Sequence, residues 1–166
     1  SIGRWRRGLR GPVAIASLSA CHPAPPAAPA PPLTGDSAQI SEAVFRHLFA
    51  NNASAAQGAA SVYCLRVDGP SDPSEALLAR FATHRPRVVA VSACTESSDG
   101  VFLRGAASGA RPGLIFAVGE ISIDGDQATA PASYFEGGLS AASYGYSLRR
   151  TAAGWEVIEQ VLFMIS

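Results

Sequence analysis

The stretch of sequence that decides the fold is LIFAVGEISIDGDQATAPASYFEGGLSAASYGYSLRRTAAGWEVIEQVLFMIS, residues 114–166. Its apolar residues alternate with polar ones or form short runs, and turn residues separate the segments, a pattern typical of β-strands. The sequence predicts four strands here, at residues 114–123, 127–135, 143–150 and 155–165. Hairpin signals at residues 124–126 and 151–154 join them into an antiparallel meander.

The last predicted strand is the most apolar of the four. Alternation places one set of side chains on one face, Trp155, Val157, Val161, Phe163 and Ile165, and a second set on the other, Ile158, Leu162 and Met164. A strand that is apolar on both faces is expected to be covered on both. We expect helices on one face, and sheet curvature or a second copy of the chain, in a homodimer through the sheet, on the other.

The residues before the meander predict two short helices and three more strands. Asp36 or Ser37 can cap a helix over about 40–51, whose apolar stripe is Ile40, Val44, Phe45, Leu48 and Phe49. The run Asp72-Pro73-Ser74-Glu75 has a cap, a proline and a glutamate in the order of a helix start. Strands are predicted at residues 61–67, 87–94 and 101–104. The predicted fold class is α+β, with two short N-terminal helices packed on a curved, mainly antiparallel sheet.

The first 36 residues predict export and a tether. An arginine-rich start precedes a short apolar run and Leu18-Ser19-Ala20-Cys21, which resembles a bacterial lipobox. We therefore expect a signal peptide over residues 1–20, a lipid on Cys21 that anchors the chain to the cell envelope, and a Pro/Ala-rich linker over 21–36. A plain secretory signal beside a cysteine is the alternative. One folded domain follows over residues 37–166.

Charge and motifs exclude several classes of function. All thirteen basic residues are arginines, and beyond residue 20 nine arginines face thirteen carboxylates, a formal charge of −4. Such a balance gives no electrostatic footprint for nucleic acid. No phosphate loop, dinucleotide fingerprint or zinc-ligand spacing is present, so neither a cofactor nor a metal is expected.

Cys64 and Cys94 each lie on a predicted strand. In an exported protein with Cys21 acylated, these two remain as an even pair, and a disulfide between them is the default expectation. A metal pair would require more soft ligands, and a nucleophile would require a base nearby. The disulfide predicts that the two strands lie close together.

The order helix, strand, helix and long meander ending in a Trp strand resembles the NTF2-like (cystatin-like cone) superfamily over residues 38–166. The residues that carry the resemblance are the aromatics Tyr134-Phe135 and Tyr144/Tyr146 and the ending Gly154-Trp155-Glu156-Val157. The resemblance implies a sheet that curves around a helix and forms a cone, which often holds a pocket. Catalytic members use an Asp/His pair in the cone, which has no counterpart here, and a plain α+β roll is the alternative architecture.

Three residues are candidates for acid/base chemistry. Glu120 follows Leu114, Phe116 and Val118 on one strand face, where burial would raise its pKa, unless strand twist brings it to the rim beside an arginine. Glu136 precedes two glycines and lies either on a bulge aimed into a pocket or in a loop. His47 either faces the cone interior, near Glu120, or borders the apolar stripe.

Tyr134, Tyr144 and Tyr146 are clustered aromatics on neighbouring predicted strands, and form either a cross-strand pair or the lining of a ligand pocket. The sequence favours a tethered envelope domain that binds a protein partner or a small ligand. A small hydrolase or isomerase with a carboxylate in the cone pocket is the alternative. An enzyme should bring at least two of Glu120, Glu136, His47 and a tyrosine around one cavity.

Overall fold

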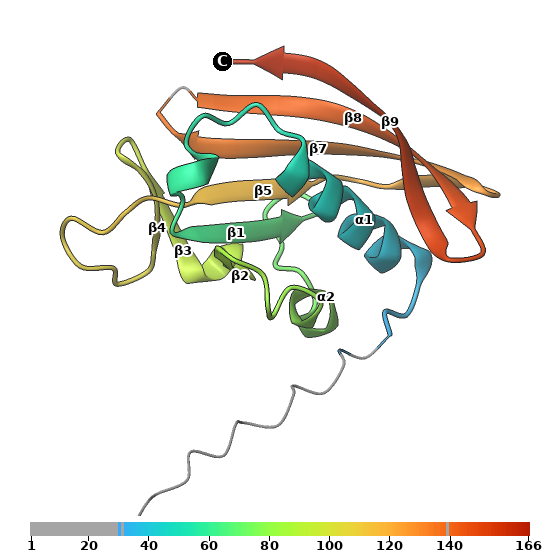
Figure 1. Ribbon diagram of the computed structural model, residues 1–166, viewed down its shortest axis with the longest axis horizontal. Helices are drawn as coiled ribbons and strands as arrows, with labels where there is room; N and C mark the ends of the chain where they lie inside the picture. The colour runs from blue at the N-terminus through green and yellow to red at the C-terminus, as the bar shows by residue number, and fades with distance from the viewer. Residues whose placement is uncertain (1–29, 31, 139) are drawn as a thin grey trace, which may run out of the picture.

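The computed structural model describes residue 30, residues 32–138 and residues 140–166. The expected signal peptide, Cys21 and most of the expected linker lie outside these described residues. The described part is α+β, with one open, mixed and mostly antiparallel sheet that carries a long helix on one face (Figure 1). Within it, no helix combines the length and the hydropathy needed to cross a bilayer.

The main sheet has the strand order β2-β1-β5-β7-β8-β9, and the short strand β6 pairs with β7. β1 lies parallel to both of its neighbours, β2 and β5, and every other pair is antiparallel. The bounds of these strands are Val62–Val67 for β1, Arg87–Ala90 for β2, Leu114–Val118 for β5, Ser122–Asp124 for β6, Gln127–Gly137 for β7, Ser140–Thr151 for β8 and Gly154–Ile165 for β9.

The predicted meander is present with one correction. Residues 114–123 form two strands, β5 and β6, because regular pairing ends at Gly119. The Gly119 N–H donates to the Pro131 carbonyl at 2.8 Å, but proline has no N–H to return the bond. A Cβ at Gly119 would also lie 2.9 Å from the Pro131 ring. The chain therefore leaves β7 at this point and rejoins it at Ser122.

The helix α1, Asp36–Ala50, buries the whole predicted stripe against the sheet. It starts earlier than expected, after Gly35 at φ 88°, and no side chain caps it, so the expected cap by Asp36 or Ser37 is wrong. The helix α2, Glu75–Ala79, is capped by Ser74, whose Oγ accepts from the Leu77 N–H at 3.2 Å, rather than by Asp72. Because α2 follows β1, α1 alone precedes the described sheet.

Residues 87–94 are not one strand. β2 ends at Ala90, a 3₁₀ turn covers Val91–Ala93, and β3, Cys94–Ser97, forms a separate hairpin with β4, Gly100–Leu103. Another 3₁₀ turn, Gln57–Ala59, precedes β1.

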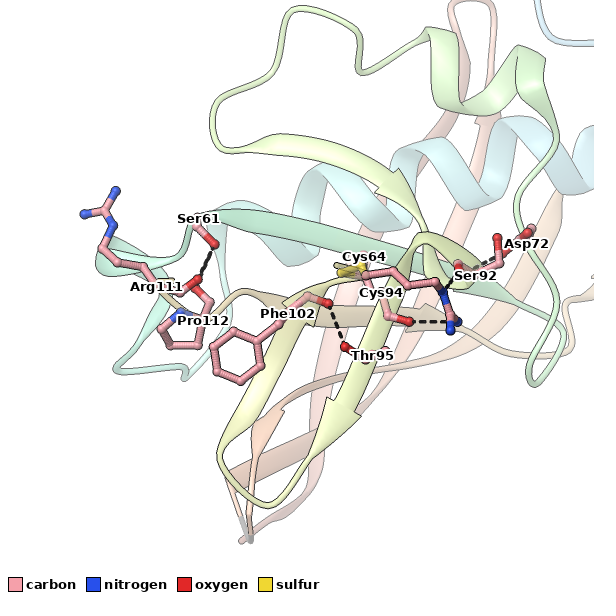
Figure 2. Close-up of a disulfide and its surroundings, with 10 residues drawn as sticks. Ser61, Cys64, Asp72, Ser92, Cys94, Thr95, Phe102, Arg111 and Pro112 are labelled. Carbon is pink, nitrogen blue, oxygen red and sulfur yellow. Dashed lines mark hydrogen bonds between the residues drawn. A yellow bond between two sulfur atoms is a disulfide. The ribbon is translucent and has the colours of Figure 1, made fainter. Parts of the chain in front are cut away.

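The predicted disulfide between Cys64 and Cys94 is confirmed, with an S–S distance of 2.01 Å, and it ties the β3–β4 hairpin to β1 (Figure 2). Arg104 supports the same turn by donating to the carbonyls of Ser92 and Cys94.

Two apolar clusters form the core, one on each face of the sheet. The larger cluster fills the space between α1, α2 and the sheet. The smaller surrounds the disulfide and contains Val62, Cys64, Val89, Cys94, Val101 and Ile115. The alternation predicted for residues 61–67 is confirmed by this division, because Tyr63 and Leu65 belong to the first cluster and Val62 and Cys64 to the second.

The start of α1 is bonded to the β8–β9 hairpin. The Asp36 carboxylate accepts from the Arg150 guanidinium, with Nη1 at 2.8 Å, and from the Trp155 Nε1 at 3.2 Å. The Arg150 guanidinium also lies 4.5 Å from the Trp155 ring centre. The hydrogen bonds from Arg150 and then from Trp155 lower the pKa of Asp36. The first helix and the last hairpin are thereby joined.

The last strand, β9, is the edge of the sheet. The described part of the chain itself does not cover both faces, because the side chains from Val161 to Ile165 are exposed, and cover by a second copy stays a prediction. These side chains are exposed on both faces of the strand.

Candidate functional site

A cleft of about 780 Å³ opens at the start of α1, where the ends of several helices and strands meet. Its walls come from the first turns of α1, the end of β1 with the turn after it, the start of α2 and the link between β5 and β6 (Figure 1). The lining residues are Ser37, Ala38, Ser41, Val67, Asp68, Gly69, Ser74, Leu77, Glu120 and Ile121. The volume is in the range of small-molecule sites.

The floor of the cleft is formed by a tight turn after β1. Val67 and Ser71 exchange two backbone hydrogen bonds, of 2.9 and 3.2 Å, across the turn. Asp68 takes the left-handed backbone conformation at φ 47°, which is uncommon for a residue with a Cβ. Its N–H donates to the Val118 carbonyl at 3.0 Å, which anchors the turn to the end of β5. The Asp68 side chain is thereby held at the mouth.

Three hydroxyls line the cleft. Ser37 and Ser41 are one helical turn apart on α1, so both face the same side. Ser41 is 5% exposed and lines the cleft from the helix side. Ser74 accepts from the Leu77 N–H, so its own hydroxyl proton is available to a ligand.

Two carboxylates are the charged groups of the lining, Asp68 and Glu120, and neither takes part in an ion pair within the described part of the chain. No arginine is among the lining residues, so the two carboxylates can pair with a cationic group of a ligand.

The two helical walls of the cleft are held together by a charged cluster behind it. The Glu42 carboxylate on α1 accepts from Arg46 at 2.8 Å and from the Arg80 Nε at 3.0 Å, at the end of α2. Arg46 also donates to the Arg80 carbonyl at 3.0 Å. These bonds fix α2 against α1, and with them the position of Ser74 relative to Ser41.

Glu120 lies at the rim of the cleft, exposed, while Leu114, Phe116 and Val118 are buried. The four residues do not share one strand face, because pairing ends at Gly119 and redirects the chain before Glu120. At the rim, an arginine was expected beside Glu120. Within the described chain, no arginine forms an ion pair with it. Its carboxylate remains available to a ligand.

Glu136 lies on a bulge, as one of its two predicted alternatives requires, but its carboxylate is occupied. It is the extra residue between the Phe135 and Gly137 pairs of β7 with β8. One oxygen accepts from the Ser54 hydroxyl at 2.6 Å and from the Ala56 N–H at 3.2 Å. The other accepts from the Ser140 hydroxyl. Glu136 therefore joins the loop after α1 to the β7–β8 hairpin.

His47 is partly buried and packs edge-on against Tyr146, with ring centres 5.5 Å apart and planes at 79°. The His47 Nδ1 and the Tyr146 hydroxyl are both buried without a described hydrogen-bond partner. Burial lowers the pKa of His47, and burial, followed by the neighbouring Tyr144, raises the pKa of Tyr146. His47 is ten residues along α1 from Ser37, about 15 Å of helix. It lies far from Glu120 and the cleft.

Tyr134, Tyr144 and Tyr146 form a row of mutually tilted rings on β7 and β8, with ring centres 6.4 and 6.3 Å apart. All three are at least 96% buried and belong to the core beneath α1. The Tyr144 hydroxyl accepts from the Ala53 N–H at 3.0 Å, which ties the loop after α1 to the sheet. The three rings therefore form the predicted cross-strand cluster, and the lining of a ligand pocket by the tyrosines stays a prediction.

Glu120 therefore lies apart from the other candidates, whereas His47 packs against Tyr146 and Glu136 lies near Tyr134. Sequence reasoning missed Ser41, Ser74 and Asp68, which form most of the polar lining. The spacing of Ser37 and Ser41 beside the apolar stripe could have identified the helix side of the cleft. Asp68 signals a turn in the sequence, but the sequence does not place that turn against β5.

No group of three histidine, cysteine or carboxylate side chains suited to a metal occurs among the residues that the structure describes. Comparisons of this chain with protein-family models, with curated proteins and with solved structures find no match.

Proposed function

We propose that this chain is an exported, lipid-anchored binding module of NTF2-like architecture, and that its cleft takes a small organic amine that carries hydroxyl groups. The observation that carries the proposal is the polar lining of the cleft of about 780 Å³, where the hydroxyls of Ser37, Ser41 and Ser74 lie with the carboxylates of Asp68 and Glu120. The hydroxyl groups of a ligand would hydrogen-bond to the serines. Binding rather than catalysis is favoured because Glu120 lies apart from His47 and Glu136.

The chemistry of the lining specifies the class of ligand. Asp68 and Glu120 supply negative charge for an ammonium group, and three serines supply donors and acceptors for hydroxyls. Ala38, Val67, Leu77 and Ile121 provide apolar surface for a short carbon skeleton. A small amino sugar or amino alcohol combines these three features.

Export is supported by the disulfide, because such bonds persist in oxidising compartments and are rare in the cytosol. The lipobox-like segment ending at Cys21 and the Pro-rich run that follows support an anchor and a spacer. A tethered module would present its cleft at a distance from the membrane surface.

The NTF2-like assignment is supported by the arrangement of the elements. α1 crosses one face of the sheet, and the chain ends in a long antiparallel series whose last strand starts with Gly154-Trp155 (Figure 1). The interior beneath the helix is filled by aromatic side chains. In the proposed module, the ligand therefore binds at the mouth beside α1 rather than deep beneath it.

The proposal is tested by NMR titration of the full chain with ethanolamine, glucosamine and spermidine, using N-acetylglucosamine as a matched compound without the ammonium group. We expect shifts at the amides of Ser41, Gly69 and Glu120 with at least one amine, and weaker binding of the acetylated sugar. Glu120→Gln should weaken binding about tenfold, since a hydrogen bond to a charged group contributes about 1.5–3 kcal/mol.

Glu156→Gln is the matched control, because it removes an exposed carboxylate from β9, which does not line the cleft. It should leave the affinity unchanged. Shifts elsewhere on the surface, equal binding of the acetylated sugar, or no shift with any of the three amines would contradict the proposed site.

A further inference from the structure

The second half of β9 is an uncovered, apolar sheet edge. β8 pairs with one side of β9, and no described strand pairs with the other. On that free side, alternate N–H and C=O groups point away from the sheet, which makes an exposed edge a template for another strand. Soluble proteins usually protect such an edge with lysine, proline or a covering loop, and β9 contains neither residue.

The edge is apolar over five consecutive residues. Their side chains are 43% to 67% exposed: Val161 43%, Leu162 51%, Phe163 67%, Met164 62% and Ile165 57%. One bulge lies within the run, where Phe163 is the extra residue between the Met164 and Leu162 pairs with β8. A bulge can protect an edge, but here the bulged residue is itself the most exposed apolar side chain of the run.

The apolar side chains lie on both faces of the sheet. Leu162 and Ile165 are opposite the buried Tyr144 and Ala142 of β8, so they lie on the helix side. Val161 and Met164 are opposite Gly145 and Ser143, on the other side.

The Phe163 ring also lies on the side away from the helix, above Gly145, where a Cβ would come within 2.4 Å of it. A partner packed on one face would leave the other face exposed. A strand added at the edge would contact the flanks of the side chains on both faces at once.

A second copy of this chain fits the edge by symmetry and by charge. β9 carries Glu156 and Glu159 and no basic residue, so it does not attract an anionic membrane surface. An antiparallel pair with its two-fold axis near Leu162 sets Val161, Leu162 and Phe163 of each copy against the same three residues of the other. The two Glu159 residues are then six positions apart, roughly 20 Å along the strands. The like charges do not meet.

The available area sets an upper bound on the interface. Six exposed apolar side chains, the five above and Ile158, offer on the order of 600 Å² per copy, so pairing removes less than about 1,200 Å² from water, at or below the lower end for specific interfaces. Backbone hydrogen bonds across the new strand pair add to this burial. The area corresponds to a reversible dimer rather than an obligate one.

We infer that two copies of this chain associate through β9, edge to edge and antiparallel, so that their sheets become one continuous sheet across a two-fold axis. No residue of β9 lines the cleft, so the dimer leaves both clefts open and does not depend on what they bind.

The test is sedimentation velocity of the full chain over a range of micromolar concentrations. We expect a concentration-dependent monomer–dimer equilibrium. Leu162→Glu places two carboxylates at the axis and should raise the dimer dissociation constant at least tenfold. Since Leu162 is half exposed in the monomer, the thermal unfolding midpoint of the variant should stay close to that of the original chain.

Ile123→Glu on β6 is the matched control, because Ile123 is 40% exposed and lies away from β9. It should leave the equilibrium unchanged. Hydrogen exchange adds a test of geometry, since pairing should slow exchange of β9 amides as concentration rises, whereas packing on one face should not.

A chain that stays monomeric throughout, or a dimer that Leu162→Glu does not weaken, would overturn the inference. So would a monomer that binds neutral phosphatidylcholine vesicles through the same residues, because the edge would then be a membrane contact.

Discussion

Replacement of both Cys64 and Cys94 by alanine should cost the fold about 3.6 kcal/mol of unfolding free energy. The disulfide closes a loop with a sequence separation of 30 residues, and the chain-entropy relation for that length gives about 3.6 kcal/mol at 25 °C. Both residues are buried in the smaller core cluster, so the loss of two sulfur atoms adds to this cost. The expected change is a large share of a typical domain stability.

The effect should be concentrated near the β3–β4 hairpin. This hairpin is a separate two-stranded sheet, and the disulfide is its covalent link to β1 (Figure 2). Urea unfolding of the double variant, followed by circular dichroism, gives the global loss. Hydrogen exchange should show faster opening at β3 and β4 than at β7 and β8, whose pairing does not involve the disulfide.

The original chain treated with dithiothreitol is the control, because reduction removes the bond and keeps both sulfur atoms. It should lose nearly as much stability as the double variant. A loss below about 1 kcal/mol in both samples would refute the reasoning, since it would mean that the remaining contacts already restrain the unfolded chain to the same extent.

Two further predictions concern pH and the anchor. Because burial lowers the pKa of His47, the unfolded chain binds this proton more readily than the folded chain. Stability should therefore fall as pH decreases below about 6.5, the usual histidine value, and His47→Phe should reduce this slope in urea unfolding series at pH 5 to 8. A slope that is the same in both proteins would contradict a buried neutral imidazole. Cys21→Ala should move the chain from the membrane fraction to the soluble fraction of a bacterial host and abolish incorporation of labelled palmitate. A variant that stays with the membrane would show that Cys21 is not the anchor.

Local sequence patterns predicted much of the architecture because the controlling interactions are near in sequence. The alternation of residues 127–135 and 143–150 gives β7 and β8, and the 124–126 turn gives the β6–β7 hairpin. The paired cysteines predicted a long-range contact because their chemistry leaves few alternatives.

The strand order was not predictable in this way. β1 lies between β2 and β5 and parallel to both, and nothing within residues 61–67 specifies either partner. The apolar pattern of β9 has a related limit. It predicts a covered strand, but the described part of a single chain provides no element to cover residues 161–165, and the pattern does not specify the partner.

The site was less predictable than the fold. Glu120 was selected because alternation placed it on the buried face, and it reaches the cleft for a different reason, the loss of pairing opposite Pro131. Ser41, Ser74 and Asp68 come from three separate segments, and only the tertiary packing of α1, α2 and the β1 turn brings them together. Glu136 and His47 are stabilising residues whose partners are distant in sequence.

The bond between Asp36 and Trp155 spans 119 positions, so the first helix meets its partner only after nearly the whole chain is present. β1 likewise can pair with β5 only after residues 114–118 are present, because Cys64 lies opposite Ile115. Such non-local contacts slow folding, because a long loop must close before either side gains from the contact. For a chain exported as proposed, slow closure is an advantage: a polypeptide that threads a narrow translocation channel must remain unfolded until its last residues have passed.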